Sequence, residues 1–417
     1  MALLSGLFNK KNNTGYTYAK MIDGSIPLYS QYGQDIYSSD VVQMSIDCIA
    51  TEISKLQPKH IRKHNDKHEI PNSSLNRLFK FSPNQLMITR DFLEKVIWLL
   101  YMNYNAFIYP QYDSIRKNGV EIRREYTAFY PLNPKMVTFL QDKTGRLFVK
   151  MNFQNANEFT LPYDSVIHLR KKFSVNEIMG GGVNGQPDNT ALRKVLNIND
   201  TVIEGLGKAI NTSLNIRGIV NIKTMLHDDK QEAERKRFEE KLKSGESGIL
   251  PLDLKSEYID LKPDPKIIDK DTMEFLENKI LYWYGVPVKI LAGNFNDEEY
   301  QAFYEKTLEP LLISFGQAFS KTIFTQRELD FGNEIIFYTK NMMYLSTKSK
   351  LELLKTAGEQ GLLTDNQKLK ILGYPPLPGE EGSRRTISLN YISTDIADQY
   401  QLKKAGNNNL NNEGGEE

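Results

Sequence analysis

A chain of 417 residues with 40% apolar and 11% aromatic side chains is long enough to bury the cores of two or three folded lobes. Its 53 basic and 52 acidic residues give a net charge of +1, which excludes a global field that would attract nucleic acid or membranes. A single cysteine, Cys48, excludes an intramolecular disulfide and indicates a reducing compartment. No stretch approaches about 18 uninterrupted apolar residues, so we expect no membrane-spanning helix.

The N-terminal part of the chain predicts a loose arm followed by helices. Residues 1–38 mix Gly, Asn, Ser and Tyr without a period, which is typical of an unstructured arm. Apolar residues recur at helical spacing from Val41 to Leu56 and predict a helix that ends before a proline. Thr89 is expected to begin a second, capped helix that ends at Asn103 to Asn105.

Three histidines between these helices, His60, His64 and His68, are spaced four residues apart. On a helix this spacing would place them on one face, as candidates for a metal site. The prolines and the Asn-Asp pair around them favour a strand, a turn and a second strand instead, in which the side chains scatter. We therefore expect a solvated hairpin and no metal.

The region from residue 106 to residue 170 predicts β structure. Short β-branched and aromatic runs alternate there with turns such as Asn133-Pro134 and Lys143-Thr144-Gly145. This pattern is typical of one antiparallel sheet of the meander kind. His168 lies in the last run, and because no nucleophile or orienting group is near it in sequence, we interpret it as a structural histidine.

A glycine-rich segment, residues 179–185, leads to a long helix expected over residues 190–214. The segment lacks the Lys-Ser/Thr pair of a phosphate-binding loop, so we expect a flexible loop. The next residues predict strands over 218–222 and 247–252 on either side of a charged helix over 228–243. That helix mixes basic and acidic residues, which is typical of a solvated helix.

The strongest periodicity lies between Asp269 and Thr325, where two amphipathic helices are joined by a tight segment. Gly285 is expected to end the first helix, and Pro287 cannot continue it. The charges Asp297, Glu298 and Glu299 suit the positive N-terminus of the second helix, which Asn296 or Asp297 is expected to cap.

The second of these helices contains Pro310, which removes one backbone hydrogen bond and should bend the axis at a cost of about 3 kcal/mol. A long aromatic stripe is expected to hold the bend in place. The stripe comprises Tyr300, Phe303, Tyr304, Leu308, Leu311, Leu312, Phe315, Phe319 and Ile323.

The C-terminal part predicts small elements and then disorder. A strand is expected over residues 334–338 and a helix over 346–356. A short helix with a capping box should start at Thr364 and close at Gly373. From residue 395 onward Asn, Gly and Glu dominate, so we expect a disordered tail.

Several rare features of the central stretch occur together at specific spacings. They are Leu281-Tyr282-Trp283-Tyr284-Gly285-Val286-Pro287, Ile290-Leu291-Ala292-Gly293 and Phe303-Tyr304-Glu305-Lys306-Thr307-Leu308-Glu309-Pro310-Leu311-Leu312. Further matches are Met102 to Ile108, with Tyr104 where a glycine is usual, Ser165 to Arg170, and Gly361 to Pro376, with Gln367 and Leu369 where Glu and Arg are usual. The combination resembles the signature of tailed-phage portal proteins of the Hong Kong 97 type, over roughly residues 40–392.

The resemblance implies an α+β portal fold with a wing of helices and antiparallel sheets, a two-helix stem, a small α/β clip and a helical crown. On this chain the implied segments are, in order, a flexible arm (1–38), the wing (39–188), a first stem helix (189–214), the clip (215–265), a second stem helix (266–285), a tunnel loop (286–297), a kinked helix that returns to the wing (298–345), the crown (346–394) and a disordered tail (395–417).

The resemblance also implies a ring of identical subunits, typically twelve, at one vertex of the phage head. Double-stranded DNA passes through such a ring during packaging and ejection, without sequence-specific contacts. The implied partners are the terminase large subunit, head-completion or adaptor proteins, and the major capsid and scaffolding proteins. The implied locations are the virion and, during assembly, the host cytoplasm, and the implied role needs no cofactor and no catalysis.

These implied roles define two sets of candidate residues. In the tunnel loop, the candidates to face DNA are Lys289, Asn294, Asn296, Asp297 and Glu298. The alternative is that Val286, Val288, Ile290 and Leu291 merely dock this loop into the core. In the clip, the candidates to dock the packaging motor are Lys230, Arg235, Arg237 and Lys241, and the alternative is a solvated helix.

Two other classes of function stay open. A metal-dependent nuclease would need clustered carboxylates, and the dense candidates are Asp228-Asp229 and Asp297-Glu298-Glu299. Both lie at helix starts, where capping explains them. A capsid scaffold would assemble without a closed ring. The net charge near zero is compatible with a conduit, because fixed cations would add salt-sensitive affinity for the DNA backbone.

Overall fold

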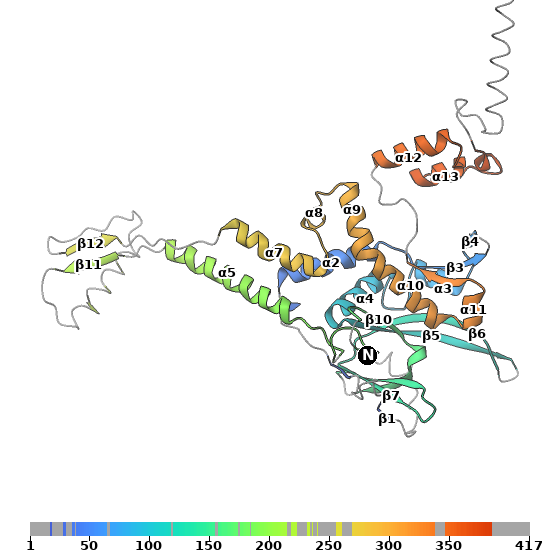
Figure 1. The fold of residues 1–417 in the computed structure, drawn as a ribbon, viewed down its shortest axis with the longest axis horizontal. Helices are drawn as coiled ribbons and strands as arrows, with labels where there is room; N and C mark the ends of the chain where they lie inside the picture. Colours follow the sequence, from blue (N-terminus) through green and yellow to red (C-terminus); the bar gives the residue numbers. More distant parts are fainter. Residues whose placement is uncertain are drawn as a thin grey trace, which may run out of the picture. The chain divides into compact units, whose positions relative to one another are not determined.

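Figure 1 shows the computed structural model of the chain. The structure describes residues 17–18, 28–30, 36–37, 39–64, 67–117, 120–154, 157–173, 176–183, 185–214, 218–222, 232–233, 236, 240, 256–260, 269–337 and 347–385. These residues divide into two compact units. The first takes the described residues within Met1–Tyr32, Ser45–Pro187 and Gly285–Glu417, and the second those within Gly33–Met44 and Asp188–Tyr284. Together they make an α+β protein.

Three antiparallel sheets form the β structure that is described in the first unit. The central sheet has the order β10 (Ile167–Arg170), β5 (Asn105–Lys117), β6 (Val120–Leu132). The second sheet is built on β7 (Met136–Gln141), which pairs with β1 (Thr17–Tyr18), β2 (Leu28–Ser30) and β8 (Leu147–Asn152), and β8 pairs in turn with β9 (Glu158–Pro162). The third has the order β13 (Asn333–Ile336), β3 (Lys59–His64), β4 (Lys67–Glu69).

The strands after residue 104 thus form two sheets, and the prediction of a single meander is wrong. β5 and β6 are also much longer than predicted, at 13 residues each, and form the long hairpin of Figure 1. Their register shifts between Gln111 and Tyr112 and again between Ile115 and Arg116. Such bulges interrupt the alternation of side chains between the two faces, which is the pattern that identifies a strand in a sequence.

The predicted histidine hairpin is confirmed as β3 and β4, in which Arg62 lies opposite Glu69. His60 is buried, and its ring nitrogens lie 2.9 Å from Ser73 Oγ and 3.1 Å from Asn333 Oδ1. His64 and His68 are exposed. The three rings therefore do not converge, and the described residues contain no cluster of His, Cys, Asp and Glu suited to a metal ion.

The first unit contains the helices α2 (Asp40–Ser54), α3 (Ser74–Lys80), α4 (Thr89–Asn103), α8 (Val288–Leu291), α9 (Asp297–Phe303), α10 (Glu309–Ile323), α11 (Gln326–Asp330), α12 (Thr347–Glu359) and α13 (Asp365–Leu372). The first residues of α2, as far as Met44, are assigned to the second unit. The helix predicted between Val41 and Leu56 is confirmed as α2. The helix predicted to begin at Thr89 is confirmed as α4, but it has no side-chain cap. Ile88 holds the N-cap position of α4, and Thr89 Oγ1 donates a hydrogen bond to Phe79 O at 3.0 Å, which ties α4 to α3.

The helical run after residue 296 is interrupted before Pro310, not at it. α9 ends at Phe303, a π-helical turn (η3, Tyr304–Leu308) follows, and α10 begins at Glu309. Glu309 N donates to Tyr304 O across this wider turn. Because Pro310 then lies in the first turn of α10, its missing N–H removes no hydrogen bond from the interior of the helix.

α10 is the central helix of the first unit's core. The predicted stripe is confirmed at Tyr300, Phe303, Leu308, Leu312, Phe315, Phe319 and Ile323, which are all buried. Phe319 lies 6.1 Å from Phe79 of α3, 6.0 Å from Phe129 of β6 and 5.0 Å from Phe337, measured between ring centroids. Each such ring contributes about 1.5–3 kcal/mol when it is buried, so this aromatic cluster fixes α10 against the central sheet and the third sheet.

The glycine-rich segment predicted as a flexible loop is instead held firmly against the core. Asn105 Oδ1 accepts a hydrogen bond from Gly180 N at 2.7 Å, and Asn105 Nδ2 donates to Gly180 O and Gly185 O. A Cβ atom on Gly180 would lie 2.3 Å from Tyr104 O, so only glycine fits there. Tyr104 itself adopts φ 55°, the left-handed conformation that explains why a glycine is usual at this position.

The C-terminal helices of the first unit follow the prediction. Thr364 caps α13 with its side chain, and Gln367 completes the capping box. Gly373 closes the helix with φ 84°. A 3-10 turn, η4 (Glu381–Ser383), follows. The tail predicted to be disordered, residues 395–417, lies outside the described residues.

The second unit is built on two long helices, α5 (Thr190–Leu214) and α7 (Lys270–Tyr284), which lie side by side (Figure 1). Strand β11 (Gly218–Ile222) is as predicted and pairs antiparallel with β12 (Ser256–Asp260), which the sequence analysis did not identify. Most of the predicted charged helix and all of the predicted strand over 247–252 lie outside the described residues.

Candidate functional site

The loop between α7 and α9 contains the residues that the sequence marks as candidates to face DNA. It starts at Gly285, which directly follows α7 and has φ 75°. Gly285 O accepts a hydrogen bond from Thr307 Oγ1 at 2.7 Å, and a Cβ atom at Gly285 would lie only 2.8 Å from Thr307 Oγ1. Glycine is therefore required here both for the backbone conformation and for the close approach of Thr307.

One side of this loop is anchored in the core of the first unit. Val286 is fully buried and Ile290 is 7% exposed. The short helix α8 starts after Pro287, and its backbone is closed by Ile290 N donating to Pro287 O at 3.0 Å. Val286 and Ile290 therefore dock the loop into the core, as the alternative interpretation expects. Val288 does not, because it is 46% exposed.

The other side of the loop is exposed, and it carries Lys289, Asn294, Asn296 and Glu298. Lys289 Nζ forms an ion pair with Glu299, and this contact lowers the pKa of the Glu299 carboxyl below its usual value. Asn294 N donates to Lys289 O at 3.0 Å. The loop is therefore anchored by its apolar residues on one side and exposes polar residues on the other. The two alternatives for the loop, docking into the core and exposure of polar candidates, thus apply to different residues.

The end of the loop is fixed by the cap of α9. Asn296 Oδ1 accepts from Glu299 N at 2.8 Å, and Asn296 N donates to Glu299 Oε2 at 3.2 Å, which is a reciprocal capping box. Of the two caps that the sequence allows, Asn296 is the one used. Asp297 is half-buried, and its Oδ2 accepts a hydrogen bond from Ser349 Oγ at 2.5 Å. Its charge is thus less available than that of Glu298.

A partly buried hydrogen bond joins α9 to α2. Tyr300 OH donates to Glu52 Oε2 at 2.8 Å, and Lys55 Nζ lies 2.5 Å from the other oxygen of the same carboxylate. Phe295 lies 5.4 Å from Tyr300 between ring centroids, so the aromatic residue before the cap also rests on this contact. No sequence signal identifies Glu52, because it lies 248 residues from Tyr300.

The second candidate set, Lys230, Arg235, Arg237 and Lys241, lies outside the described residues. Among the described neighbours of that set, Lys236 Nζ lies 4.0 Å from Glu232 Oε1, one helical turn away. Such an exposed pair contributes little to stability.

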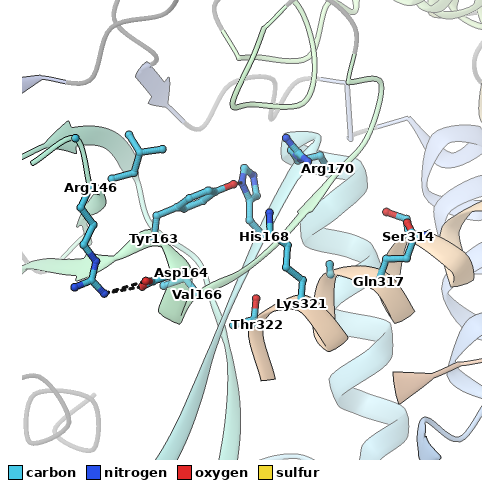
Figure 2. A pocket seen from close by; sticks show the side chains of 13 residues that line it. Arg146, Tyr163, Asp164, Val166, His168, Arg170, Ser314, Gln317, Lys321 and Thr322 are labelled. Carbon is cyan, nitrogen blue, oxygen red and sulfur yellow. Dashed lines mark hydrogen bonds and ion pairs between the residues drawn. The ribbon is translucent and has the colours of Figure 1, made fainter. Parts of the chain in front are cut away.

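His168 is a buried residue of the central sheet, as expected for a structural histidine. Its Nε2 lies 2.9 Å from Asn105 Oδ1, and its Nδ1 lies 2.9 Å from Tyr163 OH (Figure 2). Since Asn105 Oδ1 can only accept, Nε2 carries the proton, and Tyr163 OH donates to Nδ1. Burial lowers the pKa of His168 well below its usual value, and the nearby Arg170 charge lowers it further. The ring is therefore neutral, with both nitrogens occupied.

The groups on which a catalytic interpretation would depend are the acidic cluster and the single cysteine, Cys48. In the acidic cluster that a nuclease would need, Asp297 accepts the hydrogen bond from Ser349 and Glu299 is engaged in the cap and with Lys289, while Glu298 is exposed. Burial raises the pKa of the Cys48 thiol to about 11, so this side chain is a poor nucleophile. No helix within the described ranges is long and apolar enough to cross a membrane.

Comparisons with known proteins agree on one family. A family model described as "Phage portal protein" matches residues 40–373. Two curated relatives, both named "Probable portal protein", come from Lactococcus phage p2 and Lactococcus phage SK1. Each is 24% identical over 374 residues, which covers 86% of this chain and 86% of the relative.

Solved structures with a similar fold come from the necks of gene transfer agent (GTA) particles. One is the neck of an empty particle computed with C6 symmetry, with a TM-score of 0.59, 15% identity, and coverage of 84% of this chain and 96% of that chain. Another is the neck of a native particle computed with C12 symmetry, with a TM-score of 0.53, 14% identity, and coverage of 82% and 92%.

Proposed function

The chain belongs to the phage portal protein family, and we propose that it forms the ring-shaped channel at one capsid vertex through which double-stranded DNA is packaged and ejected. The observation that carries this proposal is the family match over residues 40–373, which takes in most of both units. The fold shared with GTA necks supports a role as the connector between head and tail. Since the family is structural, we expect no catalytic activity.

The proposed assembly is a ring of twelve copies at the portal vertex of the virion. The C12 symmetry of the native GTA neck supports this number. During assembly in the host cytoplasm, the ring would contact the terminase large subunit, head-completion proteins, and the capsid and scaffolding proteins. Lys230, Arg235, Arg237 and Lys241 are our candidates to contact the motor.

The proposed parts of the portal correspond to the elements of the structure as follows. The sheets on β5 and β7, with α2 to α4, would be the wing, and α5 and α7 would be the stem. The β11–β12 pair would belong to the clip, and α12 and α13 to the crown. The segment with α8 would be the tunnel loop, which its place between the second stem helix and α9 supports.

The loop would act on DNA by repulsion more than by binding. Between Val288 and Glu299 it contains one cation, Lys289, against the three carboxylates of Asp297, Glu298 and Glu299, and Lys289 is already paired with Glu299. A surface of this charge binds no phosphate strongly, so it allows DNA to move past. Its field extends over about 8 Å at physiological salt, so only DNA close to the loop is affected.

This role of the loop predicts the effect of charge on packaging. Glu298→Lys adds an exposed cation to the loop, and we expect intact rings with slower packaging that recovers as salt is raised. Lys289→Gln with Asn294→Ala should also leave rings intact and change the packaging yield. Glu352→Lys makes the same charge change on α12 and serves as the matched control. Equal packaging by Glu298→Lys and this control would refute the assignment of the loop to the channel.

The portal function itself is tested by infection with a phage whose gene for this protein has been deleted. We expect capsid proteins to accumulate without DNA-filled heads, and packaging to return when the chain is supplied in trans. DNA-filled heads that assemble without the chain would overturn the proposed function.

A further inference from the structure

A pocket of about 510 Å³ lies between the sheets and α10, away from the loop discussed above. One wall is formed by the turn after β9 and by β10, with Tyr163, His168 and Arg170. The other wall is the outer face of α10, with Ala318 and Lys321. In Figure 2 the Lys321 side chain extends from α10 toward the strand that carries His168. Both walls belong to the first unit.

The pocket has a positive charge that the described residues do not balance. Arg146 is paired with Asp164, at 2.9 and 3.2 Å between Nη2 and the carboxylate oxygens. Arg170 and Lys321 have no carboxylate partner in the part of the chain that the structure describes. With His168 neutral, three cations and one carboxylate leave an excess of two positive charges.

Arg170 makes two contacts that orient its guanidinium. Its guanidinium lies 4.1 Å above the Phe173 ring and donates a long hydrogen bond, 3.4 Å, to Ile178 O. A guanidinium fixed by stacking keeps its remaining donors in a planar fork, which matches a carboxylate. The rigid Tyr163–His168 pair forms the wall beside it.

The remaining lining indicates the class of ligand. Ser314, Gln317 and Thr322 offer hydroxyl and amide groups that can bond to peptide groups. A pocket of a few hundred Å³ admits a few residues of an extended chain or a small molecule, but not a DNA duplex. The net charge of +1 also gives no long-range attraction for a nucleic acid.

We propose that the pocket between β10 and α10 binds an acidic peptide segment of a partner protein, with Arg170 and Lys321 contacting its carboxylates. This inference does not depend on the ring or on the channel. It assigns a protein-docking site to a face of the first unit whose lining includes none of the candidate DNA-facing or motor-docking residues.

The test is the binding of a fluorescein-labelled hexaglutamate peptide to the full-length protein, followed by anisotropy at low and physiological salt. We expect saturable binding of one peptide per chain. Lys321→Gln should weaken it roughly fivefold, as expected for an exposed ion pair, and Arg170→Gln about tenfold or more, as expected for a hydrogen bond between charged groups. Ala318→Trp fills the pocket without changing charge and should abolish binding.

Lys306→Gln is the matched control, because it removes an exposed lysine from the adjacent π-helical turn, outside the pocket. Its affinity should equal that of the unaltered protein. Lys321→Gln and Ala318→Trp decide the question even where Arg170→Gln disturbs folding. No binding at low salt, or equal binding by Lys306→Gln, Lys321→Gln and Ala318→Trp, would overturn the proposal. A duplex oligonucleotide that binds through Lys321 when the peptide does not would assign the pocket to nucleic acid instead.

Discussion

Replacement of Gly285 by alanine tests how the loop between α7 and α9 is held. Gly285 has φ 75°, and the left-handed conformation costs a residue with a Cβ atom about 1 kcal/mol or somewhat more. The new Cβ atom would also lie 2.8 Å from Thr307 Oγ1, so Thr307 must move and its 2.7 Å hydrogen bond to Gly285 O is lost. That loss adds about 1 kcal/mol, so we expect a total destabilisation of about 2–3 kcal/mol.

The matched control is Gly293→Ala, because Gly293 has a similar φ of 68° but no atom within 4 Å of its Cβ position. Gly293→Ala should lower the free energy of unfolding by only about 1 kcal/mol, the cost of the left-handed conformation for a residue with a Cβ atom. Urea denaturation followed by circular dichroism measures both variants, alone and with Thr307→Ala. In the Thr307→Ala background the cost of Gly285→Ala should fall to that of Gly293→Ala. Equal costs for the two glycine variants in the unaltered background would refute the role of Thr307.

Two further predictions concern buried polar groups. Burial lowers the pKa of Lys171 from 10.5 to about 7, so between pH 7 and 10.5 the unfolded chain binds one proton more than the folded chain, and stability should rise with pH across this window. Lys171→Met should remove that rise in a series of thermal denaturation curves and should stabilise most below pH 7; an unchanged pH slope would contradict the burial of this ammonium. Tyr300→Phe removes the donor to Glu52, whose side chain is 14% exposed, and should cost about 1–2 kcal/mol in urea denaturation. The same variant in a Glu52→Gln background should cost less, and an equal cost would mean that the contact contributes nothing.

Elements governed by local periodicity could be predicted from the sequence. The stripe from Tyr300 to Ile323 was identified because burial on one helix face repeats every 3.6 residues, whatever the partner. The position of the break could not be predicted in this way. A π-helical turn at Tyr304–Leu308 separates α9 from α10, so that Pro310 lies in the first turn of α10. Whether such a turn forms depends on how the flanking helices pack, which no local sequence pattern reports.

The long hairpin of β5 and β6 had a local signal that was not used. Asn118-Gly119, which falls outside the described residues, stands between the two strands in the sequence, and Asn-Gly is the preferred pair for a tight hairpin turn. The docked glycine segment had a weaker one. Asn105 belongs to the portal-like motif, but its bonds to Gly180 and Gly185 join residues that are 75 and 80 positions apart.

The candidate loop was predicted in part. Its boundaries followed from Gly285 and from the cap at Asn296, both of which have local sequence signals. The ion pair of Lys289 with Glu299 had none, because it forms only when the loop folds back on the start of α9. The pocket beside α10 was not predicted for the same reason. Arg170 and Lys321 come from distant parts of the chain, and only the fold places them around one cavity.

The most direct test of the portal function is negative-stain electron microscopy of the purified full-length protein, combined with mass determination of the assembled particle. The proposed function predicts closed rings with a central hole and a mass close to twelve copies of the 48.0 kDa chain. Filled or filamentous particles in place of rings, from protein that is folded and assembled, would contradict it.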